Sequence, residues 1–256
     1  MVIPVKRREE ILSFVRKNKI CSIEELAKRF SVSRVTIHRV LNDLESEALV
    51  TKVHGGVRAF ESEGGIETRF TIRLKTNKAK KVEIARKALQ FVREGDTIFI
   101  DSSTTCYQFA RLLGAQESLH VTVISNSPMI SYELSGARHI GVISTGGELF
   151  QEVYTFAGDL TLEAIGKLQF EKVFLSAGAL SSVQGLMTTQ SFLALTKRRV
   201  IEKASEVNLL IDSTKFERLA PRVIAPIESV TRIISDTGLS RKLREKYGKL
   251  GAELVV

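Results

Sequence analysis

Apolar residues recur three or four positions apart in three short stretches near the start of the chain, with charged residues between them. The stretches are residues 6–18, 23–30 and 34–47, and this spacing predicts three amphipathic helices. Ser22 and Ser33 stand directly before the second and third stretches, where a hydroxyl can cap the first turn of a helix. Because only a short turn separates those two helices, the pattern is typical of a helix-turn-helix.

A β-hairpin is predicted after the third helix. Residues 49–53 and 57–60 are β-prone, and His54-Gly55-Gly56 lies between them. A diglycine between two such runs favours a tight turn. We therefore expect residues 1–60 to form a winged helix-turn-helix domain. Residues 61–76 are polar and basic with no clear period, which predicts a linker.

Residues 77–256 alternate helical stretches with short apolar runs. After a helix over residues 77–93, six strands are predicted: Thr97–Ile100, His120–Ile124, Ile140–Ser144, Lys172–Leu175, Val207–Ile211 and Arg232–Ser235. The helices predicted between them include Cys106–Leu113, Met129–Leu134, Asp159–Lys167 and Phe192–Ala204. This alternation predicts a mostly parallel sheet flanked by helices. The expected fold class is α/β, with an N-terminal winged helix-turn-helix followed by this larger domain.

Composition narrows the class of protein. The chain has 256 residues, of which 43% are hydrophobic and 26% charged, as in an ordinary globular protein. No apolar stretch approaches the length of about 18 residues that a membrane span needs, and early charges such as Lys6 argue against a signal peptide. Two cysteines and four scattered histidines predict neither a disulfide framework nor a zinc site. We expect a reduced, cytoplasmic protein without metal, cofactor or membrane contact.

The net charge of +9 is concentrated in the first third of the chain. Residues 1–81 hold 18 Lys and Arg against 10 Asp and Glu, whereas residues 82–256 hold 20 against 19. A localised basic block favours a polyanionic partner, nucleic acid before a membrane surface. A merely solvated basic face would give the same count.

Polar residues on the third predicted helix strengthen the nucleic-acid reading. The exposed N-terminal half of a recognition helix reaches base edges in the major groove. The candidate DNA-binding residues are Ser33, Arg34, Thr36, His38, Arg39 and Asn42 on this helix, and Lys52, His54 and Arg58 on or beside the wing. Such side chains donate to or accept from bases and phosphates, which predicts binding to a double-stranded DNA operator. A module that contacts another protein is the alternative.

Polar residues and glycines follow five of the predicted strands. They are Asp101, Ser102, Ser103, Thr104 and Thr105, then Asn126 and Ser127, Gly146 and Gly147, Gly178, and finally Asp212 and Lys215. In open parallel sheets such strand ends converge on one ligand crevice. Hydroxyls before a helix N-terminus favour an anion. A small phosphorylated sugar fits best, with Lys215 facing the phosphate and Asp101 accepting from sugar hydroxyls.

Several of these motifs together resemble the DeoR family of bacterial transcriptional repressors. The resemblance is carried by residues 7–57, with Ser33, Thr36, Ile37, Leu41, Leu44 and His54-Gly55-Gly56. It continues in Asp101–Thr105, Ser125-Asn126-Ser127, Gly146-Gly147, Gly185-Leu186-Met187-Thr188, Lys197-Arg198 and Asp212–Phe216. The resemblance implies a repressor of a sugar operon, controlled by a phosphorylated sugar in a sensor domain of ribose-5-phosphate-isomerase-like fold. Because helix-turn-helix proteins usually read paired half-sites, we expect a homo-oligomer.

The chain departs from the family pattern at four positions. His38 and Val40 replace an Arg and an Asp of the recognition helix, and we expect an altered operator sequence or weaker phosphate contact. Ser103 replaces a Gly and Met187 a Thr, which predicts a different effector or a looser site.

Two questions stay open in the sequence. Lys197, Arg198 and Arg199 could contact the ligand or form a solvated helix face. The isomerase-like fold also leaves an alternative function, a sugar-phosphate-processing enzyme with an accessory DNA-binding domain, in which Asp101, Asp212 and Lys215 would do acid–base work. Since a basic winged helix has no role in an isomerase, we expect a regulator without enzymatic activity.

Overall fold

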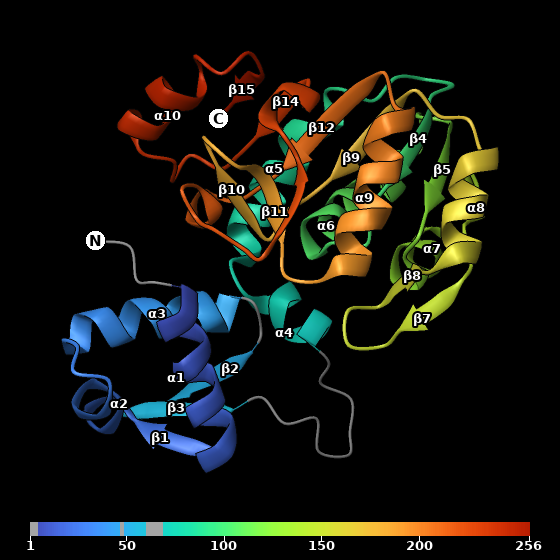
Figure 1. Ribbon diagram of the computed structural model, residues 1–256. Helices are drawn as coiled ribbons and strands as arrows, with labels where there is room; N and C mark the ends of the chain where they lie inside the picture. Colours follow the sequence, from blue (N-terminus) through green and yellow to red (C-terminus); the bar gives the residue numbers. More distant parts are fainter. Residues whose placement is uncertain (1–4, 47–48, 60–68) are drawn as a thin grey trace. The chain divides into compact units, whose positions relative to one another are not determined.

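The computed structural model describes residues 5–46, 49–59 and 69–256. The chain divides into two compact units, Met1–Thr76 and Asn77–Val256. In Figure 1 the first unit runs from blue to teal and the second from teal to red. Parts of two predictions, Glu47 at the end of the third helix and Phe60 in the wing, lie outside the described residues, as do residues 61–68 of the predicted linker.

The first unit contains the predicted helices and hairpin. Its elements are α1 (Val5–Asn18), β1 (Ile20–Ser22), α2 (Ile23–Arg29), α3 (Arg34–Ser46), β2 (Val50–Val53), β3 (Gly56–Ala59) and α4 (Arg69–Lys75). The strands form an antiparallel sheet in the order β1-β3-β2. The winged helix-turn-helix prediction is confirmed, and β1 is an addition that its three residues were too few to reveal.

Capping residues and glycines explain why these elements begin where they do. The Ser22 hydroxyl accepts from the Glu25 backbone N–H at 3.0 Å, and the Ser33 hydroxyl accepts from that of Thr36 at 3.1 Å. Gly55 takes the turn conformation at φ +73°. A Cβ on Gly56 would lie 2.5 Å from the Cys21 carbonyl oxygen, so only glycine lets β1 pair so closely with β3.

The predicted linker contains a helix. Residues 69–75 form α4, and the Phe70 side chain is buried. Helix α4 therefore lies within the range predicted as a linker, where one apolar residue among polar ones gave no periodic pattern.

The second unit is built on a seven-stranded sheet in which every neighbouring pair is parallel. The strands are β4 (Thr97–Ile100), β5 (Val121–Ser125), β6 (Ile140–Ser144), β9 (Lys172–Leu175), β12 (Glu206–Leu210), β14 (Arg232–Ile234) and β15 (Glu253–Val255). The helices are α5 (Lys78–Leu89), α6 (Thr104–Gly114), α7 (Pro128–Leu134), α8 (Asp159–Lys167), α9 (Ser191–Lys203) and α10 (Arg241–Tyr247). The mixed α/β class and the six predicted strands are confirmed.

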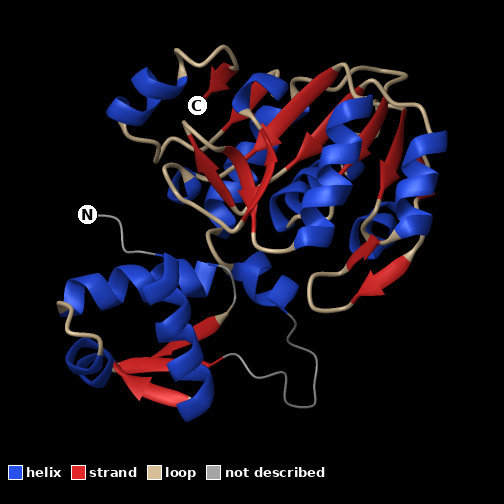
Figure 2. Cartoon of the chain, in the orientation of Figure 1, coloured by secondary structure: helices blue, strands red, loops and turns tan. Residues whose placement is uncertain are grey.

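Helices cover both faces of this sheet, as Figure 2 shows in blue against red. Alternate residues of β4 separate the two layers. Ile98 and Ile100 pack with α5, α6 and α7, whereas Phe99 packs on the other face with α8 and α9. This alternation is the expected result of a strand buried on both sides.

Short antiparallel strands complete the second unit and were not predicted. β7 (Glu148–Phe150) pairs with β8 (Thr155–Ala157), and β10 (Ala179–Ser181), β11 (Gly185–Thr188) and β13 (Arg222–Ala225) form a small sheet. Two 3₁₀ turns, η1 (Ser213–Lys215) and η2 (Ile227–Ser229), follow β12 and β13.

The strand order β15-β14-β12-β9-β4-β5-β6 has a switch point between β4 and β9. The chain first builds outward from β4 to β5 and β6, and then returns to β9 and builds in the opposite direction. Loops leave neighbouring strands in opposite directions at such a point, which opens a crevice at the carboxyl ends of the strands.

Candidate nucleic-acid interface and ligand pocket

Helix α3 has one buried and one exposed face. The buried residues, which belong to the core of the first unit, are Ile37, Val40, Leu41 and Leu44. The exposed residues are Arg34, Val35, His38, Arg39 and Asn42. A row of donors and acceptors therefore stands in solvent on the helix that follows the turn, as a recognition helix requires.

Three candidate residues serve the local fold. Ser33 and Thr36 form the helix cap, and their hydroxyl oxygens lie 2.9 Å apart. Lys52 joins the wing to α3, because its ammonium group lies 3.0 Å from a Glu45 carboxylate oxygen and its backbone N–H donates to the other oxygen at 3.0 Å. The remaining wing candidates, His54 and Arg58, are exposed.

Val35 is a candidate contact residue that the sequence interpretation missed. Its side chain is 78% exposed between Arg34 and Thr36. An apolar side chain on a recognition helix can contact a thymine methyl group. Its place in the N-terminal half of the helix was the available signal, although an apolar side chain does not fit a pattern of hydrogen-bonding residues.

The departures at His38 and Val40 have different consequences. Val40 is 2% exposed and packs in the core, so it adds apolar contact and does not face the candidate DNA surface. His38 is exposed on that surface. An effect on operator sequence therefore rests on His38 alone.

The second candidate site lies at the switch point, where Asp101 follows β4. One Asp101 carboxylate oxygen accepts from the Ser103 backbone N–H at 2.9 Å, and the other accepts from the Ser176 backbone N–H at 3.3 Å. Lys197 of α9 forms an ion pair with the second oxygen. The side chains of Asp101 and Lys197 are 4% and 10% exposed, so two opposite charges compensate each other in a buried position.

Asn126 brings a second polar group to the same place. Its amide nitrogen donates to the Thr155 hydroxyl at 2.9 Å, and that hydroxyl donates to the Ser102 hydroxyl at 2.6 Å. The Asn126 amide oxygen is buried and has no hydrogen-bond partner within the part of the chain that the structure describes. Because an orphaned buried acceptor is costly, this atom is the natural place for a ligand donor.

These residues line one pocket beneath α9. Its lining is Phe99, Asp101, Ser102, Asn126, Leu175, Leu193, Thr196, Lys197 and Val200. Of the predicted ligand residues, the pocket therefore contains Asp101, Ser102 and Asn126. The sequence allows Lys197 either to contact the ligand or to lie on a solvated helix face. Its burial excludes the solvated face. Arg198 and Arg199 are exposed.

Other strand-end candidates are buried or already make hydrogen bonds within the protein. Ser103 and Ser127 cap α6 and α7 by accepting from the Cys106 and Ile130 backbone N–H groups. Thr104 and Thr105 are buried in the first turn of α6. Gly178 donates from its backbone N–H to the Met187 carbonyl at 2.9 Å.

The two glycines after β6 differ from each other. A Cβ on Gly147 would lie 2.0 Å from the Thr161 hydroxyl oxygen, so its neighbour fills the space that a ligand was expected to use. A Cβ on Gly146 would meet nothing within 4 Å.

The departures at Ser103 and Met187 lie outside the pocket lining. Ser103 has ordinary extended backbone angles (φ −73°, ψ 155°), and its hydroxyl caps α6. Met187 packs in a small apolar cluster with Ala179 and Ala220. Neither position therefore supports the expectation of a reshaped pocket.

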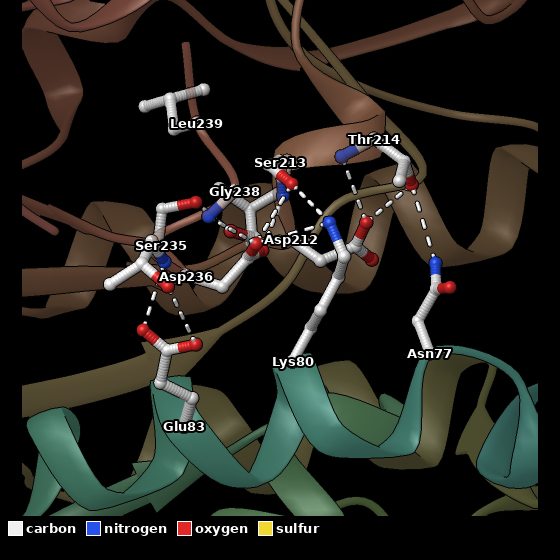
Figure 3. Close-up of polar contacts among 12 residues, drawn as sticks. Asn77, Lys80, Glu83, Asp212, Ser213, Thr214, Ser235, Asp236, Gly238 and Leu239 are labelled. Carbon is white, nitrogen blue, oxygen red and sulfur yellow. Dashed lines mark hydrogen bonds and ion pairs between the residues drawn. The ribbon is translucent and has the colours of Figure 1, made fainter. Parts of the chain in front are cut away.

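Asp212 and Lys215 belong to a separate turn, η1, which follows β12. Figure 3 shows Asp212, Ser213 and Thr214 of this turn beside Asp236 of the loop after β14. Asp212 accepts from the backbone N–H of Thr214 at 3.0 Å and from its hydroxyl. Ser213, between them, contacts Lys80 and Asp236. Of the five strand ends, those of β4 and β5 contribute polar residues to the pocket and that of β12 forms a separate hydrogen-bonded turn, whereas the glycines after β6 and β9 belong to neither.

No group of three His, Cys, Asp or Glu side chains that could hold a metal ion occurs within the described ranges. None of the helices in the described part of the chain is long and apolar enough to cross a membrane.

Comparison with known proteins covers both units. Residues 7–63 match the DeoR-like helix-turn-helix domain, and residues 76–237 match the DeoR C terminal sensor domain. The chain is 28% identical to the lactose phosphotransferase system repressor of Lactococcus lactis subsp. lactis over 95% of both chains. It is 30% identical to the L-fucose operon activator of Escherichia coli (strain K12) over 90% of this chain and 94% of that protein. A ribose 5-phosphate isomerase A of Methanocaldococcus jannaschii aligns with 56% of this chain and 57% of its own, at a TM-score of 0.43 and 19% identity.

Proposed function

This chain belongs to the DeoR family of transcriptional regulators, and from that premise we propose that it controls a sugar operon. In this proposal α3 and the wing bind an operator in double-stranded DNA. A small phosphorylated sugar binds in the second unit and changes the affinity for DNA. Repression that the sugar phosphate relieves is the simplest form of this control.

The exposed row on α3 carries the DNA-binding half of the proposal. Arg34, His38 and Arg39 stand in solvent on the face opposite the buried residues of the helix. Arginine side chains make bidentate contacts with guanine edges and with phosphates. Because such helices commonly read two half-sites, the proposal includes a dimer or larger homo-oligomer.

The pocket supports a ligand rich in hydroxyl groups. Asp101 and Lys197 compensate each other, so this part of the pocket favours a neutral polar group, and the Asn126 amide oxygen lacks a donor. In this proposal the anionic group lies toward Lys215, because η1 follows β12 and the carboxyl ends of these parallel strands share one edge of the sheet. Two relatives are named for lactose and fucose systems, which supports a sugar as the source of the signal.

The proposal requires binding without turnover. A regulator needs only a difference in ligand affinity between two states. The proposal therefore predicts that a bound sugar phosphate is recovered unchanged after long incubation with the protein. Conversion to an isomer would instead support the alternative of a sugar-phosphate-processing enzyme.

A thermal-shift panel of sugars and their phosphates, tested in matched pairs, examines the ligand class. A ligand at 100 times its dissociation constant stabilises the native state by about 2.7 kcal/mol, which is on the order of 5–10 °C for a domain of this size. We expect one phosphate to shift the melting temperature while its free sugar does not. A panel in which no phosphate shifts the melting temperature would contradict the proposed effector.

A further inference from the structure

One face of α5 carries Lys80, Glu83 and Lys87 at helical spacing, and Asn77 stands directly before the first turn of the helix; we call these four residues the α5 row. Figure 3 shows Asn77, Lys80 and Glu83 pointing from this helix toward the loops that follow β12 and β14. Residues three or four apart share one face of a helix, so the row can contact both loops at once.

Asp236, in the loop after β14, is the centre of these contacts. One carboxylate oxygen accepts from the Ser213 backbone N–H at 2.7 Å. The other accepts from the Ser213 hydroxyl at 2.8 Å and the Gly238 backbone N–H at 3.0 Å, and lies 3.1 Å from the Lys80 ammonium nitrogen. Lys80 also donates to the Ser213 hydroxyl at 2.5 Å. Ser213 is thus held through both its backbone and its side chain.

The contact is closely packed and its charge is compensated. The Asp236 side chain is 1% exposed, whereas that of Lys80 is 33% exposed. Burial alone would raise the pKa of Asp236, but hydrogen bonds from Ser213 and Lys80 lower it below its ordinary value. A Cβ on Gly238 would lie 2.6 Å from the Asp236 carboxylate and 2.9 Å from the Lys80 nitrogen, so no side chain fits beside the pair.

Ser213 begins the 3₁₀ turn η1, which ends at Lys215. The Lys215 backbone N–H donates to the Asp212 carbonyl at 3.0 Å, and the Thr214 backbone N–H donates to the Asp212 carboxylate at 3.0 Å. The turn is therefore short and internally bonded, and fixing Ser213 fixes the place from which the Lys215 side chain starts.

We propose that Lys80 and Asp236 are positioning residues that hold η1, and with it Lys215, in place to receive the anionic group of the effector. The anionic ligand rests on the proposed function, whereas the positioning of η1 rests on the contacts themselves. Neither Lys80 nor Asp236 needs to touch the ligand.

The α5 row supplies its own matched control. Lys87 donates to the Glu83 carboxylate at 2.8 Å and to the Ser235 carbonyl at 3.0 Å, and Glu83 accepts from the Thr237 backbone N–H at 2.8 Å. Lys87 therefore binds the loop after β14 without contacting η1. Lys80→Met and Lys87→Met each remove one ammonium group from the same helix face, but only the first should release η1.

Amide hydrogen exchange on the full chain tests the positioning without any ligand. We expect Lys80→Met to speed exchange at Ser213 and Lys215 by about tenfold and Lys87→Met to leave these amides unchanged. Lys87→Met should instead speed exchange at Thr237. Gly238→Ala, which displaces the Asp236 carboxylate, should reproduce the effect of Lys80→Met. Unchanged protection of Ser213 in both Lys80→Met and Gly238→Ala would overturn the proposal.

Titration with inorganic phosphate, against chloride at equal ionic strength, tests the consequence for binding. We expect Lys80→Met to weaken phosphate binding by about tenfold beyond any change in ligand-free melting temperature, and Lys80→Arg to recover part of the loss. Lys87→Met should bind phosphate like the parent. Equal phosphate affinity in Lys80→Met and Lys87→Met would overturn the link between η1 and the ligand. Absence of phosphate binding in the parent would contradict the proposed effector class, while hydrogen exchange would still decide the positioning.

Discussion

The two candidate sites use polar side chains in opposite ways. On α3 the candidate side chains Arg34, His38 and Arg39 stand in solvent. In the pocket Asp101 and Lys197 are nearly fully buried and depend on each other. The exposed Arg34 pairs with Glu24 at the surface, where water screens the two charges, whereas the buried pair must be satisfied before any ligand arrives. The comparison teaches that the first unit presents exposed polar side chains, whereas the second holds a buried, charge-compensated pair beside apolar residues such as Leu175 and Val200.

The strongest test of this contrast is removal of one charge from the buried pair. Lys197→Met leaves the Asp101 carboxylate buried without its ion-pair partner, and we expect the second unit to lose about 3–5 kcal/mol of stability. Denaturant unfolding of the variant measures this loss. Lys167→Met is the control, because Lys167 pairs with Glu163 over 2.5 Å on the exposed surface and its removal should leave unfolding nearly unchanged. Equal stability of the two variants would show that the buried charges are not coupled.

Removal of a charge from the exposed row should weaken DNA binding and leave stability nearly unchanged, which is the opposite of the effect expected at the buried pair. Arg39→Ala is expected to weaken DNA binding by about 1–3 kcal/mol while the melting temperature stays within 1 °C or so of the parent. Fluorescence anisotropy with a labelled duplex measures the affinity. Arg241→Ala, at a side chain that is 93% exposed in the second unit, is the control and should bind DNA like the parent. A large loss of stability in Arg39→Ala would contradict the expectation that this exposed side chain contributes little to folding.

Acidification should reduce the stability of the second unit, because it protonates the hydrogen-bonded carboxylate of Glu217. Burial would raise the pKa of Glu217, but hydrogen bonds from Lys246, Tyr247 and Ser182 lower it to about 2 from 4.5. A lowered pKa means that the folded unit binds fewer protons than the unfolded chain in this range. The stability from Glu217 is therefore present above pH 4.5 and is lost as the pH falls toward about 2. We expect Glu217→Gln to flatten this acid dependence in thermal melts, and a parent-like acid dependence would contradict the assignment.

The smallest expected effect is a change of sequence preference. His38→Arg adds a fixed charge and a bidentate donor on the exposed face of α3. We expect a few-fold gain in affinity and an altered preference at one base pair. Gel shifts with a set of single-base operator variants would measure both, and identical preference with identical affinity would remove His38 from the contact surface.

Strong periodicity made much of the fold predictable from the sequence. The three N-terminal helices, the hairpin and six parallel strands were predicted, because continuous apolar strands and capped amphipathic helices leave clear patterns. Short elements such as β1, β8 and β15 were missed, since three residues carry too little pattern. Helix α4 was missed because it lies in a mostly polar segment, in which the Phe70 side chain is buried.

The ligand pocket was predicted only in part. Strand ends pointed to Asp101 and Asn126, because parallel topology places such ends at one edge. Lys197 lies on the apolar stripe of α9 between Ala194 and Val200. This spacing indicated a buried side chain, but a lysine is ordinarily expected in solvent. Thr155 comes from a hairpin that the pattern did not reveal. The ion pair of Lys80 with Asp236 joins parts of the chain that are far apart in the sequence, so no local sequence pattern could predict it.

Selection of DNA from a random duplex pool by the full chain, with and without matched sugars and sugar phosphates, tests the central claim most directly. The account predicts one enriched motif, arranged as paired half-sites, whose recovery changes strongly with one phosphate and not with its free sugar. An enriched motif that no phosphate affects would contradict control through the pocket. A pool with no enriched motif would contradict the exposed face of α3 as a DNA-reading surface.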